Sequence, residues 1–449
     1  MGLNVIYYGP PGTGKTYLMQ ELKQNYLDYY ISDDDIRNAY LRTSQDWVLV
    51  ALIILQNENK MKSTEIEQKI NSLNINGFNN NASTVLEQHC VEQHDPLFPP
   101  LQPRIFTKNG DVWSVKVNNL LEYNSKFFEE YLSTTAIKER FKYVTFHQSF
   151  TYEDFVEGIR PILDNHSENS QEGNLDYHYS ANVAENRESY KNAESSIRYK
   201  VQNGVFKEIC EEARKDPNKE YAIFIDEINR GNISEIFGEL ITLIEEDKRI
   251  GNPNELEVTL PYSKQKFGVP KNLKIIGTMN SADRSTALID IALRRRFEFV
   301  HMTCNLEVLA SHLRKKGLNP QDIEGVNLIK LLDVINKRIK LLLDANFVIG
   351  HAFFMHIETL EDIIRTFKNK IIPLLEEYFY EDLEKIQIVL ADLDASGELK
   401  PNAIYKHEML HPDELLEYQG NLIIESKKNF YIGEITRESL QKIYSNVEG

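Results

Sequence analysis

Cysteine is scarce in this chain of 449 residues, which contains only Cys90, Cys210 and Cys304. Their separations match none of the short spacings that bind zinc. So few thiols cannot build the disulfide framework of a small secreted domain. This cysteine content is typical of a protein in a reducing compartment, and we therefore expect the protein in the cytoplasm.

Long hydrophobic runs are also missing. No apolar stretch approaches the roughly 18 residues that cross a membrane. The short apolar run at residues 3–8 leads directly into a glycine-rich loop, so we expect it to be a buried strand and not part of a signal peptide. No membrane partner is expected.

The chain also lacks an excess of positive charge. It has 51 Lys and Arg and 68 Asp and Glu, for a formal net charge of −17. Attraction of the whole protein to nucleic acid is therefore not expected, although a local basic surface stays open. Hydrophobic residues at 41% and charged residues at 27% are ordinary for a soluble globular protein. The length allows roughly two to three domains.

The chain does contain a complete G-x-x-x-x-G-K-[ST] motif, made of Gly9, Pro10, Pro11, Gly12, Thr13, Gly14, Lys15 and Thr16. Residues 3–8 before it predict a buried strand, and residues 17–26 after it have helical spacing. Backbone N–H groups in such a loop bind phosphate at a helix N-terminus. Lys15 would reach the terminal phosphates and the Thr16 hydroxyl would bind Mg²⁺. The sequence therefore predicts a nucleoside-triphosphate site.

Two later apolar runs also predict strands that end in polar side chains. Residues 221–227 end in Asp226 and Glu227, which we expect to hold Mg²⁺ and to polarise the attacking water, respectively. A surface turn is the alternative for such a pair. Residues 273–280 end in Asn280, which would orient that water, with a turn or cap as its alternative.

Three consecutive arginines, Arg294, Arg295 and Arg296, precede Phe297. They would form a solvated helix end, interact with a helix C-terminus, or supply cations to the phosphates of a neighbouring subunit. The last interpretation requires assembly into a ring.

These motifs, together with residues 145–158, 225–232, 237–240, 277–285, 292–297 and 349–354, resemble the McrB-type AAA+ family, over residues 1–30 and about 140–390. The resemblance implies a hexameric ring, a preference for GTP over ATP, and stimulation by a McrC-like partner that commonly carries the nuclease. It also implies that DNA is reached through the complex. By this pattern Asn280, Asp283 and Arg284 shape the hydrolytic site, and Arg294 and Arg295 act on the neighbouring subunit.

The fold that follows is an α/β AAA+ P-loop module, with a parallel sheet flanked by helices. We expect the nucleotide-binding core at residues 1–30 and 140–304, a helical lid at 305–390, and a C-terminal extension at 391–449. The chain contains no N-K-x-D guanine-reading motif, so the expected preference for GTP depends on the family resemblance alone. Two alternatives remain: an ATP-driven remodeller of proteins, and a nucleotide-gated DNA-binding module with negligible hydrolysis.

Residues 31–139 form an insertion between the loop helix and the strand expected at 143–147, far longer than an ordinary connection. Helices are predicted at residues 46–56, 63–70 and 82–92, followed by a hairpin at 104–115 around an Asn-Gly turn. This order resembles a winged helix in which residues 82–92 would face DNA. The family pattern places a recognition domain ahead of the motor, and we expect the insertion to replace it.

The charge of the insertion argues against DNA as its partner. Residues 41–122 contain seven Lys or Arg and nine Asp or Glu. This balance is unfavourable for binding driven by phosphate contacts. We therefore favour a protein-contact or regulatory role and keep nucleic-acid binding as the alternative.

Two further features have competing interpretations. His351, beside aromatic residues, is interpreted as a core histidine in preference to a nucleotide contact. Asp394, Glu398 and Lys400 superficially match a nuclease pattern, but Gly397 between them predicts a turn. We do not expect the chain itself to cut DNA.

Overall fold

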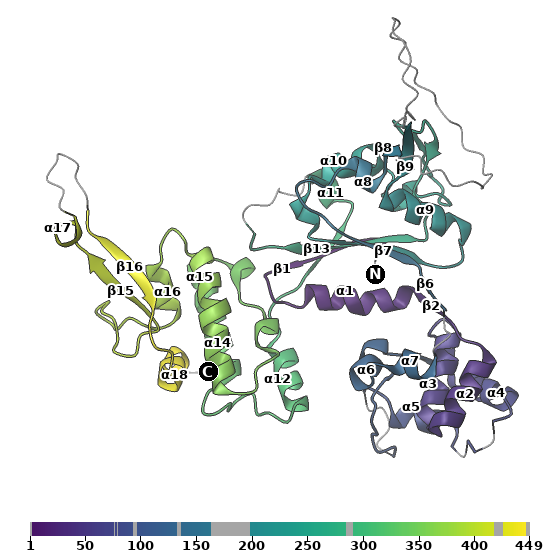
Figure 1. Ribbon diagram of the computed structural model, residues 1–449, viewed down its shortest axis with the longest axis horizontal. Helices are drawn as coiled ribbons and strands as arrows, with labels where there is room; N and C mark the ends of the chain where they lie inside the picture. Colours follow the sequence, from purple (N-terminus) through teal and green to yellow (C-terminus); the bar gives the residue numbers. More distant parts are fainter. Residues whose placement is uncertain are drawn as a thin grey trace, which may run out of the picture. The chain divides into compact units, whose positions relative to one another are not determined.

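The computed structural model describes residues 2–75, 77–78, 80–92, 97–132, 136–162, 198–283, 291–416 and 425–445 (Figure 1). The chain divides into two compact units. Unit 1 contains residues 1–5, 18–277 and 287–298, and unit 2 contains residues 6–17, 278–286 and 299–449. The four domain boundaries expected from the sequence remain predictions.

A five-stranded parallel sheet in the order β14-β1-β13-β10-β7 forms the centre of the nucleotide-binding core. The strands are β1 (Asn4–Gly9), β7 (Phe141–Thr145), β10 (Tyr221–Asp226), β13 (Leu273–Asn280) and β14 (Glu298–His301). In β10, residues 221–225 are all buried, as expected of a strand covered on both faces. The predicted α/β AAA+ fold is confirmed. Strand β14 was not predicted.

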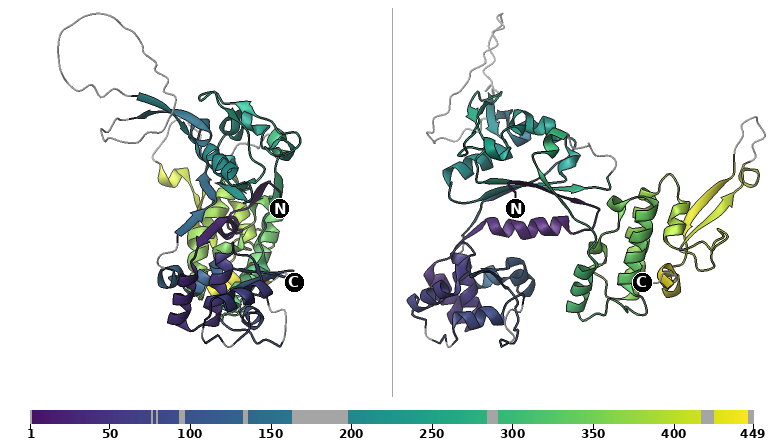
Figure 2. Two further views of the ribbon diagram at one scale, coloured as in Figure 1. Left: turned by 90° about the vertical axis from the view of Figure 1, so that its right-hand side faces the viewer. Right: turned by 180° about the vertical axis from the view of Figure 1, so that it is seen from behind.

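Helix α1 (Lys15–Lys23) lies along one face of this sheet and α9 (Val205–Lys215) along the other (Figures 1 and 2). Helix α1 starts and ends slightly earlier than the helix predicted at residues 17–26, and a short 3-10 turn continues it to Tyr26. The remaining elements of the core are α8 (Tyr152–Phe155), β8 (Glu157–Ile162), β9 (Arg198–Asn203), α10 (Ile233–Phe237), β11 (Val258–Thr259), β12 (Lys266–Phe267) and α11 (Ile291–Arg294).

Two short antiparallel pairings complete the core. Strand β9 pairs with β8, and β11 pairs with β12, both antiparallel. Residues 159–162 belong to β8. Residues 163–197 lie outside the part of the chain that the structure describes.

A fully buried arginine connects the starts of two sheet strands. Arg249 donates hydrogen bonds to the carbonyls of Ile244, Pro270 and Leu273, and to Oδ1 of Asn4 at 2.6 Å. Burial lowers the pKa of its guanidinium to about 10. Four acceptors therefore compensate for the buried charge, and they connect the beginning of β13 to β1.

The inserted module begins and ends at a two-stranded sheet. Strand β2 (Leu27–Tyr30) pairs antiparallel with β6 (Ala136–Glu139). Beside them, Nε of Arg140 lies 2.9 Å from Oδ1 of Asp28, and both side chains are buried. Because this ion pair joins the two crossings of the chain, it fixes the entry and exit of the insertion in one place.

The inserted module has the element order expected for a winged-helix-like domain. It contains α2 (Asp33–Thr43), α3 (Asp46–Gln56), β3 (Met61–Lys62), α4 (Ser63–Ser72), α5 (Ala82–Gln88), β4 (Phe106–Asn109), β5 (Val112–Val115), α6 (Val117–Tyr123) and α7 (Phe127–Tyr131). The three short strands form a sheet in the order β3-β5-β4. Residues 47–55 of α3 are all buried, which makes this helix the centre of the module.

Two details of the module differ from the prediction. The hairpin turn consists of Gly110 and Asp111, one residue later than expected, since Asn109 still pairs with Val112. Helix α5 ends at Gln88 instead of residue 92, because Cys90 forms a β-bridge with Phe106.

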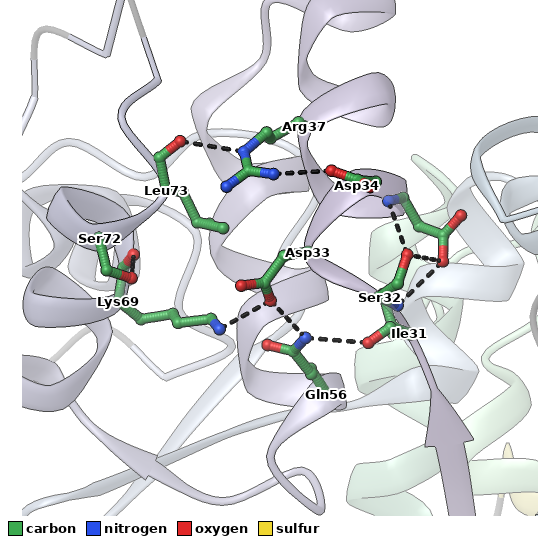
Figure 3. A network of polar contacts seen from close by, with 10 residues as sticks. Ile31, Ser32, Asp33, Asp34, Arg37, Gln56, Lys69, Ser72 and Leu73 are labelled. Carbon is green, nitrogen blue, oxygen red and sulfur yellow. Dashed lines mark hydrogen bonds and ion pairs between the residues drawn. The ribbon is translucent and has the colours of Figure 1, made fainter.

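Polar side chains connect three helices of the module (Figure 3). Asp33, at the start of α2, accepts hydrogen bonds from Gln56 of α3 and from Lys69 of α4. The amide of Gln56 also donates to the carbonyl of Ile31. Ser32 caps α2 through the backbone N–H of Asp35. The acidic residues at the start of α2 thus stabilise the fold by binding groups of the module itself.

Unit 2 contains the helical lid. Its helices are α12 (Leu306–Lys315), α13 (Leu328–Leu342), α14 (Leu360–Thr366), α15 (Ile372–Tyr378) and α16 (Glu384–Val389). A π-helical turn, Phe367–Ile371, joins α14 to α15 just before Pro373. A π turn is one of the known ways to interrupt a helix without ending it.

The C-terminal residues of unit 2 share one hydrophobic core with the lid, and a buried carboxylate connects them to one another. The elements here are β15 (Tyr405–Leu410), α17 (Pro412–Leu415), β16 (Lys427–Ile432) and α18 (Arg437–Ser445). Asp392 accepts hydrogen bonds from the N–H groups of Ile404 and Tyr405 and from Lys442 of α18. None of the described helices is long and apolar enough to cross a membrane.

The suspected nuclease pattern near the C-terminus is a turn, as predicted. The N–H of Asp394 donates to the carbonyl of Glu398, and the carboxylate of Asp394 accepts from Ser396. Gly397 has a φ of +86°, in the left-handed region that favours glycine. The carboxylate of Asp394 therefore stabilises the turn.

Candidate nucleotide-binding site

The phosphate loop has the backbone that its glycines predict. Gly12 and Gly14 have φ values of +74° and +88°, in the left-handed region. Gly9 is required for a different reason, since a Cβ there would lie 1.9 Å from the carbonyl oxygen of Met302. The loop therefore needs glycine at these positions to form at all.

The carbonyl groups of the loop are bound by the protein. Lys15 Nζ donates to the carbonyls of Gly9 and Pro10, each at 2.7 Å. The carbonyls of Pro11 and Gly12 accept N–H groups of Gly350 and Ala352, at 3.2 and 2.8 Å. In a trans peptide the C=O points opposite to the next N–H. The N–H groups that follow these carbonyls are thereby directed away from the lid contact, as an anion site requires.

The end of strand β13 is connected to the same loop. The N–H of Ser281 donates to the carbonyl of Gly9 at 3.0 Å. Asn280, just before it, accepts the N–H of Ala282 through Oδ1 at 3.2 Å. Within unit 2, the phosphate loop thus contacts the chain directly after Asn280, and the role of Asp283, two residues past Ser281, stays a prediction. Arg284, predicted beside them, lies outside the described residues.

A lid segment, Gly350 to Phe353, packs directly on the phosphate loop. A Cβ on Gly350 would lie 2.0 Å from the backbone of Gly12, and a Cβ on Gly12 would lie 2.6 Å from the ring of Phe353. Asn336 of α13 fixes the start of this segment, because its amide bonds both the N–H and the carbonyl of Ile349. Residues 349–354 are one of the motifs that carry the family resemblance, but their contact with the phosphate loop was not predicted.

His351 lies within that lid segment and is 7% exposed. Its Nδ1 accepts the backbone N–H of Asn305 at 3.2 Å. Burial lowers the pKa of the imidazole below its usual value. Its Nε2 lies 3.8 Å from the position that a Cβ would occupy on Gly14. The histidine is therefore buried, as predicted, and also lies beside the phosphate loop.

In unit 1, Asp226 is the last residue of β10. The Tyr143 hydroxyl donates to its Oδ2 at 2.8 Å. Burial and this carboxylate raise the pKa of Tyr143 to about 12. The ammonium of Lys23 lies 3.6 Å from the centre of the Tyr143 ring. The Tyr143 hydroxyl therefore orients the carboxylate of Asp226, and Lys23 packs on the tyrosine ring.

Glu227 has an unusual backbone conformation for a residue with a side chain. Its φ of 52° and ψ of 46° are left-handed, and the carboxylate accepts Nε of Arg230 at 3.2 Å. A non-glycine residue in this region costs about 1 kcal/mol or more and is often found at functional sites. This strain favours a site residue over the surface turn that the sequence left open.

The register of the sheet relates the ends of two of these strands. Ile225 is the last residue of β10 that pairs with β13, opposite Gly277, and Asp226 pairs with Thr145 of β7 on the other side. Asn280 lies three residues beyond Gly277 along β13. Carboxylate and hydroxyl oxygens are the ligands that Mg²⁺ prefers. Asp226 of unit 1 and Thr16 of unit 2 each carry an oxygen of this kind. No group of three or more His, Cys, Asp or Glu able to hold a metal occurs among the described residues.

The three arginines after α11 differ in exposure. The Arg296 side chain is 7% exposed and lies 2.6 Å from Glu245. Arg295 is 68% exposed, 3.7 Å from the same carboxylate, and Arg294 is also exposed. Arg296 therefore stabilises the core, whereas Arg294 and Arg295 are accessible, as their predicted role toward a neighbouring subunit requires.

Comparison with known families agrees with this arrangement. Residues 125–297 match the model of the AAA domain (dynein-related subfamily), and residues 327–387 match that of the McrB alpha-helical lid domain. The chain is a McrB-type AAA+ protein. The first match begins after most of the inserted module, so in this McrB-type chain the insertion separates the phosphate loop from the rest of the domain.

Two curated relatives are both named as restriction components. The Type IV methyl-directed restriction enzyme EcoKMcrB subunit of Escherichia coli K12 is 34% identical over 56% of this chain and 49% of its own length. The Type II restriction enzyme BsuMI component YdiS of Bacillus subtilis 168 is 26% identical over 53% of this chain and 69% of its own. This McrB-type chain thus matches about half the length of the first relative.

Proposed function

We propose that this protein is a nucleoside-triphosphate hydrolase, with GTP as the favoured substrate, and the motor subunit of a McrBC-like restriction complex. It would assemble into a ring, in the cytoplasm, and drive a McrC-like partner nuclease against DNA. The single observation that carries the hydrolase proposal is the phosphate loop. Its carbonyls are bound by Lys15 and by the lid, and its two left-handed glycines form the conformation in which backbone N–H groups bind phosphate.

Each site residue has a defined task in the proposed hydrolysis. Lys15 would leave the loop carbonyls and neutralise the terminal phosphates. Thr16 and Asp226 would hold Mg²⁺, which neutralises charge that develops on the phosphates. Glu227 would polarise the attacking water, and Asn280 would align it. Asp283 and Arg284 would complete this site, as the family resemblance implies.

Ring assembly follows from the need for a cation from outside the chain. Arg294 and Arg295 are exposed beside the partly buried Arg296. A cation contributed in trans stabilises the transition state of phosphoryl transfer. We propose that these two arginines act on the nucleotide of a neighbouring subunit, with a hexamer as the expected ring.

For the inserted module, the proposal is a protein-contact or regulatory role. Lys108 is the lysine of the predicted wing hairpin. Its Nζ lies 3.1 Å from Oε1 of Glu87 on α5, and 5.0 Å from the centre of the Trp113 ring. A lysine held by a carboxylate contributes little to phosphate binding. This contact supports a protein partner over DNA for the surface formed by α5 and the hairpin.

A turnover assay with the purified full chain tests the hydrolase proposal. GTP and ATP are supplied separately and in competition, with and without a McrC-like partner. We expect hydrolysis that prefers GTP and rises when the partner is added. Preference for ATP would favour the remodeller, and background turnover under all conditions would favour a nucleotide-gated binding module.

A further inference from the structure

The lid segment beside the phosphate loop contains a polar group that the proposed reaction does not use. His351 is buried in unit 2, and one ring nitrogen already has a partner, because Nδ1 accepts the N–H of Asn305 at 3.2 Å. A neutral imidazole with an acceptor at Nδ1 must carry its proton on Nε2. Burial lowers the pKa of this ring, which favours the neutral form near pH 7.

The ring nitrogen Nε2, which carries this proton, lies on the side of His351 next to the phosphate loop. It lies 3.8 Å from the position of a Cβ built on Gly14, and Cε1 lies 4.0 Å from it. No hydrogen bond to Nε2 is present among the described residues. Gly14 directly precedes Lys15 in the loop that is proposed to bind the phosphates. Nε2–H is thus a donor at the rim of the phosphate site.

We propose that His351 binds the nucleotide, donating Nε2–H to a non-bridging phosphate oxygen, and so connects the lid to the phosphates. This rests on the proposed nucleotide binding. A neutral donor suits this position, because Lys15 already supplies a cation in the same loop. The contact would add to the backbone bonds by which Gly350 and Ala352 hold Pro11 and Gly12.

Two amide substitutions separate the roles of the two ring nitrogens. In His351→Gln, the longer side chain can place an N–H donor near the position of Nε2. In His351→Asn, the shorter side chain can keep only an acceptor near the position of Nδ1, toward Asn305. His312→Gln is the matched control, since this lid histidine bonds the carbonyl of Met355 instead.

The experiment measures the affinity of the full chain for GTP, GDP and guanosine by displacement of fluorescent mant-GDP. Loss of one hydrogen bond to a charged phosphate oxygen corresponds to about tenfold or more in affinity. We expect His351→Asn to weaken GTP and GDP binding by about this factor and to leave guanosine binding unchanged. His351→Gln should stay within about threefold of the unmodified protein, and His312→Gln should have no effect.

Other outcomes are equally decisive. Equal affinities for all variants would overturn the role of His351 while leaving nucleotide binding intact. An equal loss for guanosine would place His351 on the base or ribose and also contradict the proposal. If the unmodified protein binds no nucleotide, the proposed function itself fails. The rise in melting temperature with GDP, measured against each variant without nucleotide, keeps the comparison valid if a substitution destabilises the lid.

Discussion

The phosphate loop and the inserted module differ in how they use polar groups. In the loop, protein donors bind the carbonyls of Gly9, Pro10, Pro11 and Gly12, and binding of the last two directs the N–H groups of Gly12 and Thr13 away from the lid. In the module, Asp33, Gln56 and Lys69 bond one another and connect three helices (Figure 3). Polar groups therefore form the proposed ligand site in the phosphate loop, whereas in the module they hold the helices together.

The same contrast applies to positive charge. Lys15 is held by carbonyl groups, which are weaker partners than phosphate, so it can change partners when a nucleotide binds. Lys108 and Lys69 of the module are held by the carboxylates of Glu87 and Asp33. Charges that are already neutralised are poor candidates for ligand binding. Substitutions in the two regions should therefore have effects of very different size.

The largest effect is expected for Lys15→Ala. Removing the ammonium that faces the terminal phosphates should lower triphosphate affinity by about a hundredfold and abolish turnover. Displacement of mant-GDP by GTP and a phosphate-release assay measure the two quantities. Lys215→Ala, on the exposed end of α9, is the matched control and should change neither. Normal turnover by the Lys15 variant would contradict the loop as the site.

The next largest effect is expected for Glu227→Gln. Without a base for the attacking water, turnover should fall by about 10²- to 10⁴-fold while triphosphate binding persists. Bound triphosphate should then trap the assembled ring, which light scattering detects as a stable high-mass species. Glu235→Gln, exposed on α10, serves as the control. Unchanged turnover in the Glu227 variant would remove its proposed role.

Arg294→Ala and Arg295→Ala test the contribution across subunits. Each should lower turnover by about a hundredfold or more and leave nucleotide affinity within about twofold. Mixing either variant with Lys15→Ala should restore part of the turnover, because each subunit supplies what its neighbour lacks. Arg314→Ala, on an exposed lid residue bonded to Glu307, should be neutral. Loss of activity without restoration in mixtures would place these arginines outside a shared site.

Local signals explain what the sequence could predict. The phosphate loop was predictable because its glycines, lysine and threonine all lie within residues 9–16. Strand β10 was predictable because residues 221–225 are uniformly apolar. The hairpin of the insertion was predictable from Asn109 and Gly110, with an error of one residue in its turn. In each case the residues that decide the structure are neighbours in the sequence.

What was missed depends on contacts between distant residues. Arg249 lies in a polar stretch typical of a surface, yet it is buried by acceptors from Ile244, Pro270, Leu273 and Asn4. The lid contact with the loop joins residues about 340 positions apart through backbone groups, which carry no sequence pattern. The side of His351 that faces Gly14 was missed for the same reason.

The smallest effect is expected for Asp33→Asn in the inserted module. Hydrogen bonds from Lys69 and Gln56 lower the pKa of the Asp33 carboxyl, so its charged form stabilises the fold. The side chain is 43% exposed, and such a pair contributes at most about 1 kcal/mol. At pH 7, hydrogen exchange in α3 and α4 of the full chain should be about twofold to fivefold faster in the variant.

The pH dependence of this effect decides its origin. A carboxyl whose pKa is lowered by folding stabilises the protein above its unfolded pKa of about 3.9, and this stabilisation is lost as the pH falls through the folded pKa. The exchange rates of Asp33→Asn and the unmodified protein should therefore converge toward pH 3. Asp34→Asn is the control, because its carboxylate is 82% exposed and bonds only Arg37 among the described residues. A difference that persists at pH 3, or an equal effect at Asp34, would show that the Asp33 charge does not stabilise the module and would weaken the contrast with the phosphate loop.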